Sequence, residues 1–396
     1  MGIKDRLSGN EATAMAMKSM NMDVMAAFPI TPSTEIPEQF SQYVANGLTD
    51  TVFVPVESEH SAMSACIGSQ AAGARSCTAT SSNGLALMHE MLHIASAMRL
   101  PITMACITRA ITGPINIHND HSDAMSSRDC GWIQIHAEDV QEAYDNYIMS
   151  VRIAEHKKVL LPVMICQDGF ITSHAVENVE LLEEEDIRSF VGFYEPDYYL
   201  LNPELKVAMG PYDPPTYLME HKRQQAEAMI DSLDVIKEIY DEFGKLTGRY
   251  YDLIETYKIE DAERIIILLG SSAGTAKIVV DELRSKGEKV GIIKIRSYRP
   301  FPGKLIREAL KSPKVVAVLD KAEGLSSIGG PVYSDVCAAL NGNAGFKIVN
   351  YIYGIGGRDV RTDDIHEVFA DLQDDIDGKE SKAKTAANYR YLALRE

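Results

Sequence analysis

The chain has 396 residues, of which 45% are hydrophobic and 24% charged, which is long enough for two domains and ordinary for a globular protein. Its 57 acidic residues outnumber 39 basic ones, and the formal net charge of −18 argues against a nucleic-acid-binding protein. No apolar run is as long as a membrane span, and the first residues lack the apolar segment of a signal peptide. We therefore expect a cytoplasmic protein with no membrane contact.

The six cysteines are spread along the chain, and no two lie closer than eleven positions. Iron–sulfur clusters and Cys-rich zinc sites need closely spaced cysteines. The sequence therefore predicts neither kind of site in this chain. Free thiols inside apolar runs fit a reducing compartment.

The chain begins with a helix followed by a short strand. Gly9–Met20 has helical spacing, and Asp23–Phe28 is a short apolar run. The proline-rich stretch that follows forbids a helix until after Pro32, where a hydroxyl residue can cap a helix that runs to about Val44. Free amides at such a helix start suit an anion, and a rigid loop explains the same residues equally well.

Residues 51–101 contain two βα units. The run Thr51–Val56 predicts a buried strand, and a helix of small residues follows it to about Gly73. A second strand, Arg75–Thr80, leads through a turn into a helix over Leu85–Met98. Two βα units in succession predict an α/β fold, with a parallel sheet covered by helices on its faces.

Polar residues follow both strands at their carboxyl ends, the edge at which parallel sheets bind ligands. Glu57 and Glu59 follow the first strand, and the turn Ser81-Ser82-Asn83-Gly84 follows the second. We expect the chemistry here, with Glu59 placed to accept a hydrogen bond from a closely packed group. Stabilisation of a helix start by negative charge would explain either glutamate without any ligand.

The second of these helices carries His89-Glu90-Met91-Leu92-His93, which matches the HExxH pattern of zinc proteases. Such a site needs a third ligand downstream. No Asp or Glu occurs between Ile94 and Asn119, and no further His precedes His118. The helix is otherwise apolar, so we expect no metal site here. A zinc hydrolase would instead contain stoichiometric zinc.

A third strand, Ile102–Thr108, ends at Arg109 and opens a long polar loop. An arginine at a strand end can bind a carboxylate through two parallel hydrogen bonds, although a purely structural arginine fits equally well. Residues 118–123 in this loop could be drawn as metal ligands, but a hydrogen-bonded loop explains them better.

Beyond this loop the pattern predicts a helix over Glu138–Glu155, a strand over Val159–Ile165 and an extended acidic excursion over residues 180–214. A long polar helix, or a pair of helices, then runs from Glu220 to about Tyr257, with breaks near its two glycines. We divide the chain into a first domain at residues 1–232, a helical linker at 233–260 and a second domain at 261–396.

The second domain shows a fresh βα pattern. The predicted strands are Arg264–Leu269, Val290–Ile295, Val315–Leu319 and Lys347–Ile352, with helices at Thr275–Lys286, Gly303–Leu310 and Val332–Leu340. The glycine-rich turn Gly270–Gly274 lacks the lysine and the spacing of known phosphate loops, so it is weak evidence for a nucleotide site. The charged tail from Asp374 is expected to be peripheral.

Six sequence blocks occur together in one known family. They are FPITPST (28–34), ESEHSAM (57–63), TATSSNGLALMHE (78–90), NIHNDHSDAMSSRDCGWIQ (116–134), LLPVMICQDGF (160–170) and VGIIKIRSYRPFP (290–302). In this order they resemble the alpha subunit of the thiamine-diphosphate-dependent 2-oxoacid:ferredoxin oxidoreductases, most closely the multi-subunit pyruvate enzymes. The resemblance implies a pyrimidine-type thiamine-diphosphate-binding domain followed by a smaller transketolase C-terminal-like domain. It also makes the histidine pair incidental to a family helix.

The resemblance assigns roles to residues at the predicted strand ends. Glu59 is the carboxylate that hydrogen-bonds the aminopyrimidine ring of thiamine diphosphate. Thr31 and Arg109 bind the carboxylate of the substrate, and Phe28 and Pro29 contribute to the cofactor site. The three polar residues follow three strands of one predicted sheet, so they can converge on one crevice.

The resemblance further implies that this chain is catalytically incomplete. It has no GDG motif with a downstream Asn to hold Mg²⁺ and the cofactor diphosphate, and no cysteine set for [4Fe-4S] clusters. A beta subunit is expected to supply the diphosphate and magnesium site. A ferredoxin-like iron–sulfur subunit and a gamma subunit are expected to complete the enzyme, which uses CoA and ferredoxin.

The substrate implied by the resemblance is a 2-oxoacid, with pyruvate favoured. A threonine at position 31, in place of a second basic residue, argues against oxalate. Ile111-Thr112-Gly113 departs from the Leu-Ser pair of family pyruvate enzymes, which keeps branched-chain and aromatic 2-oxoacids as alternatives. A non-catalytic scaffold subunit is the competing hypothesis, and the joint presence of Thr31, Glu59 and Arg109 counts against it.

Overall fold

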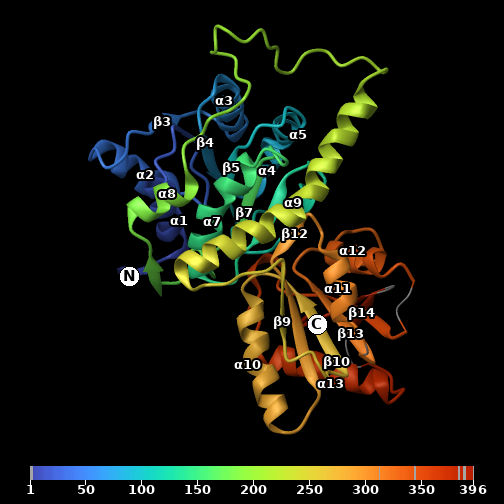
Figure 1. The fold of residues 1–396 in the computed structure, drawn as a ribbon. Helices are drawn as coiled ribbons and strands as arrows, with labels where there is room; N and C mark the ends of the chain where they lie inside the picture. The colour runs from blue at the N-terminus through green and yellow to red at the C-terminus, as the bar shows by residue number, and fades with distance from the viewer. Residues whose placement is uncertain (1–2, 312, 343–344, 382–383, 387–388, 396) are drawn as a thin grey trace.

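The computed structural model describes residues 3–311, 313–342, 345–381, 384–386 and 389–395. Two seven-stranded sheets, each flanked by helices, form an N-terminal and a C-terminal part (Figure 1). A small antiparallel pair, β1 (Ile3–Leu7) with β8 (Glu177–Leu181), flanks the first part. No helix in the described part of the chain is both long and apolar enough to cross a membrane.

The sheet of the N-terminal part has the order β12-β6-β7-β5-β4-β2-β3. Its strands are β2 (Val24–Ala27), β3 (Val52–Pro55), β4 (Ser76–Thr80), β5 (Thr103–Thr108), β6 (Ile133–His136), β7 (Val163–Asp168) and β12 (Ser297–Arg299). All neighbours pair in parallel except β12, which is antiparallel to β6. The central strands β4, β5 and β7 are buried along their whole length, as the prediction of a helix-covered parallel sheet requires.

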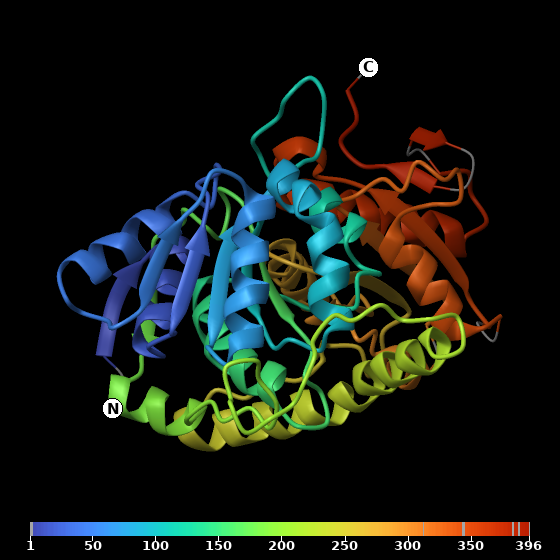
Figure 2. The same ribbon diagram turned by 90° about the horizontal axis from the view of Figure 1, so that it is seen from above.

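Helices cover both faces of this sheet (Figures 1 and 2). They are α1 (Gly9–Ser19), α2 (Glu35–Ala45), α3 (Glu59–Ala72), α4 (Ser82–Leu87), α5 (His89–Ala97), α6 (Ser122–Ser126), α7 (Val140–Glu155), α8 (Glu184–Val191) and α9 (Leu218–Thr247). The most deeply buried is α7, which packs on β7 and contacts α1, α8 and α9.

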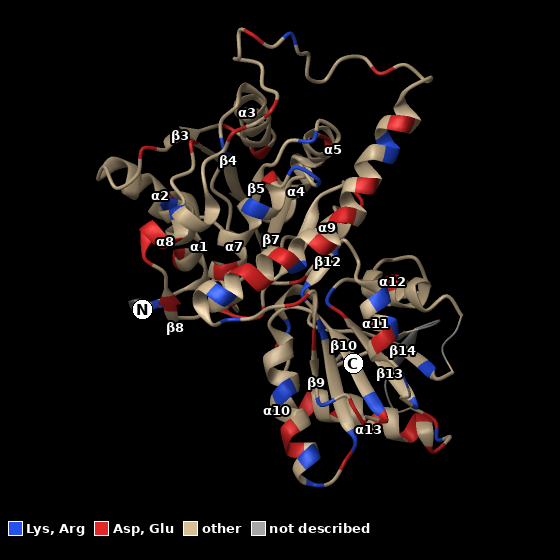
Figure 3. Ribbon diagram, in the orientation of Figure 1, with Lys and Arg blue, Asp and Glu red and all other residues tan. Residues whose placement is uncertain are grey.

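The long helix α9 runs along the outside of the first part (Figure 2). Its apolar residues Val235, Ile239 and Phe243 join the first core, and charged residues recur along the helix (Figure 3). The predicted break near Gly244 is wrong, because that glycine lies inside the helix. The predicted break at Gly248 is confirmed, since this residue caps the helix with a φ of +79°.

Three further expectations for the first part need correction. The run expected as a buried strand is β3, an edge strand whose Val52 is 60% exposed. The helix expected over Leu85–Met98 is two helices, α4 and α5, which meet at Met88. The start of the predicted acidic excursion forms β8 and α8, and the segment between α8 and α9 then reaches out beyond α3 (Figure 1).

The sheet of the C-terminal part has the order β15-β16-β14-β13-β10-β11-β9. Its strands are β9 (Ile254–Tyr257), β10 (Arg264–Leu268), β11 (Val290–Ile295), β13 (Val315–Asp320), β14 (Lys347–Ile352), β15 (Lys384–Ala386) and β16 (Tyr389–Tyr391). The flanking helices are α10 (Ser272–Ser285), α11 (Gly303–Ala309), α12 (Pro331–Leu340) and α13 (Thr362–Ile376).

The charged tail is less peripheral than its composition suggests. Strand β16 pairs in parallel with β14, and α13 continues through Asp374 to Ile376. Arg390 is 8% exposed and donates to Asp371 at 2.7 Å and to Asp375 at 2.8 Å. The expectation of a peripheral tail is therefore wrong for this strand, since paired carboxylates compensate its buried guanidinium.

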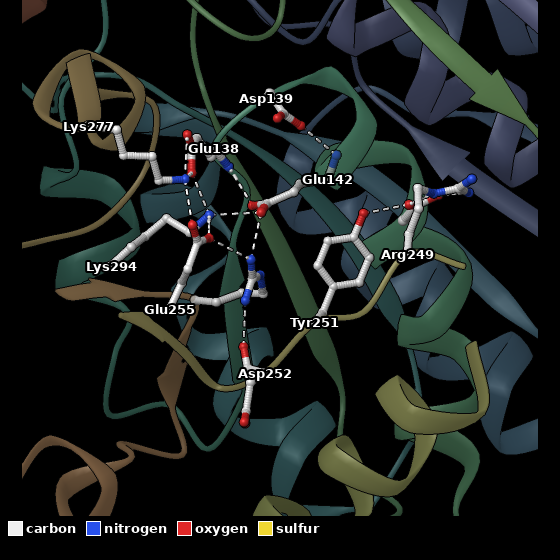
Figure 4. A network of polar contacts seen from close by, with 11 residues as sticks. Glu138, Asp139, Glu142, Arg249, Tyr251, Asp252, Glu255, Lys277 and Lys294 are labelled. Carbon is white, nitrogen blue, oxygen red and sulfur yellow. Dashed lines mark hydrogen bonds and ion pairs between the residues drawn. The ribbon is translucent and has the colours of Figure 1, made fainter. Parts of the chain in front are cut away.

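Two buried ionic clusters join the parts. In the first, Glu142 near the start of α7 accepts from Lys294 of β11 at 2.8 Å and from Arg296 at 2.6 Å (Figure 4). Glu255 of β9 accepts from the same two cations. In the second cluster, Asp168 at the end of β7 accepts from Lys321 of the C-terminal part at 2.7 Å. These clusters hold the second sheet against the edge at which the strands of the first sheet end.

Candidate active site

Glu59 begins α3 immediately after the edge strand β3. Ser58 caps the helix, with its side chain accepting from Ser61 N at 3.2 Å. Glu59 is 7% exposed, whereas Glu57 is exposed and accepts from the Ser61 hydroxyl, which lowers its pKa. Geometry therefore separates two glutamates that the stabilisation of a helix start by negative charge would treat alike.

The Glu59 carboxylate has no hydrogen-bond donor among the residues that the structure describes. The side chain is mostly buried, but its carboxylate oxygens are not fully enclosed, so they can accept a hydrogen bond from a bound ligand. Two hydroxyls beside this carboxylate, Thr80 Oγ1 and Ser81 Oγ, are buried and also lack partners in the described part of the chain. A polar nitrogen heterocycle such as an aminopyrimidine would satisfy such a set. The residues thus fit the pyrimidine half of thiamine diphosphate.

Gly84 in α4 shapes the space around this carboxylate. A Cβ atom at this position would lie 2.6 Å from Glu59 Oε1 and 2.6 Å from Thr80 Oγ1. Only a residue without a side chain allows such an approach between the start of α4 and the start of α3. The turn after β4 therefore packs directly on Glu59.

Asp123 of α6 ties the ends of β4 and β5 together. Its Oδ2 accepts from Ser82 N at 2.8 Å and from Arg109 N at 2.9 Å. Burial raises the pKa of Asp123 well above its ordinary value, against the opposing effect of these backbone donors. Asp123 was missed as a site residue, because nothing in a polar loop shows which carboxylate folds back onto the strands.

Arg109 and Thr31 lie in direct contact. Arg109 is 4% exposed; its Nη1 donates to Thr31 O at 2.7 Å and its Nε donates to Asn116 O at 3.2 Å. Its Nη2 has no partner among the described residues, which leaves a charged donor for a ligand. Thr31 and Pro29 are exposed, and Phe28 is half-buried, in the loop after β2.

Residues 118–123 of the polar loop after Arg109 are hydrogen-bonded, as the sequence favoured. Asn119 Nδ2 donates to Thr108 O at 3.1 Å, and His121 Nε2 lies 2.8 Å from Asp168 Oδ1. Asn116 Nδ2 donates to Gly356 O at 3.0 Å, so the C-terminal part borders the crevice on this side. The structure thus brings Thr31, Glu59 and Arg109 to one edge of one sheet, on loops that contact each other.

Comparison with known proteins shows the family to which the chain belongs. A family model described as pyruvate flavodoxin/ferredoxin oxidoreductase, thiamine diP-binding, matches residues 15–241, more than half of the chain. The chain belongs to this family. A second model, pyruvate:ferredoxin oxidoreductase core domain II, matches residues 262–365.

Family members of known name align over almost the whole chain. Pyruvate synthase subunit PorA of Thermotoga maritima is 50% identical over 98% of this chain and 98% of the relative. Ketoisovalerate oxidoreductase subunit VorA of Pyrococcus abyssi is 41% identical over 94% of each. The family therefore includes subunits of enzymes named for different 2-oxoacids.

Solved structures show the family fold at low sequence identity. The 2-oxoglutarate:ferredoxin oxidoreductase of Magnetococcus marinus, solved with 2-oxoglutarate, coenzyme A and succinyl-CoA, superposes with a TM-score of 0.73 at 19% identity. The match covers 94% of this chain and 65% of that longer one. A split-gene transketolase superposes with a TM-score of 0.51 at 13% identity, over 87% of this chain and 89% of that one. The arrangement predicted from the sequence, a thiamine-type domain followed by a transketolase-like one, is confirmed as a fold class.

Proposed function

We propose that this chain is the alpha subunit of a thiamine-diphosphate-dependent 2-oxoacid:ferredoxin oxidoreductase of the pyruvate synthase type. The enzyme would convert pyruvate and CoA into acetyl-CoA and CO₂ and pass two electrons to ferredoxin. The observation that carries this proposal is the carboxylate of the mostly buried Glu59, which has no donor within the described chain and lies at the ligand-binding edge of the sheet. Membership of the family supplies the chemistry to which that geometry is suited.

Thiamine diphosphate, when bound, supplies a carbon nucleophile that attacks the 2-oxo group and accepts the electrons left by CO₂. Glu59 would hold a proton at a ring nitrogen of the aminopyrimidine, which sets the protonation state of the exocyclic amine. The absence of a side chain at Gly84 keeps the space beside this carboxylate open. Phe28 and Pro29 would pack against the ring.

Arg109 would bind the carboxylate of the substrate through its unpartnered Nη2, with Thr31 beside it. A guanidinium held by two carbonyl groups is pre-oriented and loses little side-chain entropy when the substrate binds. One cation and one hydroxyl suit a monocarboxylic 2-oxoacid better than a dicarboxylic one.

The remaining catalytic parts would come from partner subunits. We place the diphosphate and Mg²⁺ site in a beta subunit, and the [4Fe-4S] clusters in a ferredoxin-like subunit of an assembly that also contains a gamma subunit. All six cysteines of this chain are free, and five are buried, which supports both cluster binding elsewhere and a reducing, cytoplasmic location.

We also retain the proposed division into a cofactor domain (1–232), a linker (233–260) and a packing domain (261–396). The two family matches, over residues 15–241 and 262–365, support a division between the two domains near residue 260. Strand β12 of the second domain nevertheless joins the first sheet.

Purification of the native complex under anaerobic conditions, followed by 2-oxoacid-dependent reduction of a viologen dye, tests this proposal. Pyruvate should give the highest kcat/KM, ahead of 3-methyl-2-oxobutanoate, an aromatic 2-oxoacid and 2-oxoglutarate, and turnover should require CoA. The chain alone should be inactive. A higher kcat/KM for the branched-chain acid would move the enzyme to the ketoisovalerate class, and dye reduction with no 2-oxoacid tested would contradict the proposal.

A further inference from the structure

Three side chains of types that can ligate metals lie close together where α5 packs against the loop after α6. His89 and His93 lie one turn apart on α5, and Cys130 lies on the segment before β6. Cys130 Sγ lies 3.4 Å from His93 Nε2 and 3.7 Å from His89 Nδ1. One ligand atom of each residue lies within 4.8 Å of the others. None of the three belongs to the site built around Glu59 and Arg109.

The third donor is what the sequence pattern lacks. No Asp, Glu or His follows the histidine pair closely in the sequence. The fold instead places Cys130, which lies 37 residues after His93, next to the two histidines. Around a tetrahedral zinc ion, with Zn–S of about 2.3 Å and Zn–N of about 2.0 Å, sulfur and nitrogen ligands lie roughly 3.6 Å apart. The observed separations of 3.4 and 3.7 Å fit this spacing before any adjustment.

We propose that His89, His93 and Cys130 bind a zinc ion, with the fourth coordination position open to water. The site opens onto a surface hollow of about 330 Å³, lined in part by His93, Arg128, Lys222 and Met229. His93 is exposed and Cys130 is buried, so the ion can enter from solvent and reach the thiolate. Imidazole and thiolate are ligands that zinc prefers over the oxygen donors favoured by magnesium.

Hydrogen bonds outside the ligand set hold these residues in place. Ser96 Oγ on α5 donates to Cys130 O at 2.5 Å, and Trp132 Nε1 donates to Leu92 O at 3.0 Å. Arg299 Nε donates to Arg128 O at 3.1 Å from the opposite side. The cysteine segment is thus fixed against α5 without a metal, which lowers the conformational cost of binding one.

Zinc binding is coupled to the deprotonation of Cys130. A Zn–S bond would replace the S–H bond of the thiol and release one proton to solvent.

A hydrolytic role does not fit the same site. The glutamate of the HExxH pattern, Glu90, is 76% exposed at its side chain and faces His60 of α3 at 3.7 Å. It is therefore engaged away from the histidine and cysteine cluster. The zinc would cross-link α5 to the segment before β6.

The test measures zinc in the complete complex, purified without chelator and dialysed against zinc-free buffer. The wild type should retain about one zinc per alpha chain, measured by inductively coupled plasma mass spectrometry. Cys130→Ser and His93→Gln should each lose most of it. Cys337→Ser and His366→Gln remove one thiol and one imidazole elsewhere, so they should keep the wild-type content. His93 is exposed, so His93→Gln tests the site with little risk to folding.

Cobalt reports the ligand set independently of enzyme activity. The apo complex loaded with Co²⁺ should show a thiolate-to-cobalt charge-transfer band and intense tetrahedral d–d bands. The charge-transfer band should disappear in Cys130→Ser and persist in Cys337→Ser. Equal zinc content in wild type and both site variants, or a cobalt spectrum without the thiolate band, would overturn the proposal and leave Cys130 as a thiol hydrogen-bonded to His93.

Discussion

Two glutamates two positions apart face different surroundings at the start of α3. Glu57 is exposed and takes a hydroxyl donor from Ser61, whereas Glu59 is 7% exposed and has no donor within the described chain. The cap at Ser58 determines this difference, because it sets which glutamate enters the first helical turn and points toward Gly84. The structure thus distinguishes Glu59, which can accept from a ligand, from Glu57, which only stabilises the start of a helix.

Gly84→Ala should disable the site with little effect on the fold. The added Cβ would lie 2.6 Å from Glu59 Oε1, so the carboxylate must shift away from its ligand. We expect viologen reduction to fall at least about tenfold, because small misplacements of catalytic groups are costly. Gly68→Ala, in α3 with open space around its Cβ, is the matched control and should keep full activity. Equal activity of the two variants would show that Gly84 does not constrain Glu59.

Arg109→Gln should weaken substrate binding. Hydrogen bonds to charged groups contribute about 1.5–3 kcal/mol, which corresponds to an increase in the KM for pyruvate of roughly ten- to a hundredfold. Arg99 is a suitable control, because it also donates to two carbonyl groups but precedes β5 instead of following it. Arg99→Gln should leave KM unchanged. A KM for Arg109→Gln within twofold of the wild type would argue for a purely structural arginine.

At the scale of elements, helix α7 joins the two parts through Glu142. Burial disfavours its charge, but Arg296 and Lys294 outweigh this effect and lower the pKa of Glu142 to about 2 from an ordinary 4.5. Because the pKa of Glu142 is lower in the folded state than in the unfolded state, its ionised form stabilises the fold above pH 4.5. This stabilisation is lost as the pH falls toward 2. Glu142→Gln should therefore destabilise the chain at neutral pH by about 3–5 kcal/mol, as removal of one partner from a buried cluster does.

Urea unfolding followed by circular dichroism checks this prediction. The gap in unfolding free energy between wild type and Glu142→Gln should be full at about pH 7 and should narrow between about pH 4.5 and 3. Glu242→Gln removes a partly exposed pair with Arg152 and should change stability by less than about 1 kcal/mol. A gap that is constant over this pH range would exclude a role for the ionised Glu142.

Helices and strands with a clear hydrophobic period and clear end signals in the sequence were predictable. The runs that became β4, β5, β10 and β11 alternate with helices, and their burial on both faces follows from the parallel arrangement. The prediction that β3 is buried was wrong, because an apolar run does not show which strand lies at the edge of a sheet. Strands β6 and β12 were missed, since they pair across some 160 residues and each is at most four residues long.

At the scale of the whole molecule, the candidate site was predictable only in outline. Strand ends locate Thr31, Glu59 and Arg109, because all parallel strands of one sheet present their carboxyl ends at the same edge. Asp123 and Cys130 were not predictable, since tertiary folding alone brings them to Arg109 and to the histidine pair. The two ionic clusters between the parts likewise join residues more than 150 positions apart.

At the same scale, we propose that the chain acts together with a cofactor and a partner chain. One edge of one sheet provides a carboxylate, a guanidinium and a threonine, and the hydroxyls of Thr80 and Ser81 lack partners among the described residues. A bound cofactor would supply partners for these groups.

The most direct test is the rate of pyruvate-dependent viologen reduction by the intact complex carrying Glu59→Gln, compared with Glu57→Gln. Both changes remove one negative charge near the start of α3, so an effect through helix charge alone would be similar in both. We predict a loss of about a hundredfold or more for Glu59→Gln, as for removal of an acid–base group, and near wild-type rate for Glu57→Gln. Full activity of Glu59→Gln, or equal losses in the two variants, would contradict the assignment of Glu59 to the cofactor.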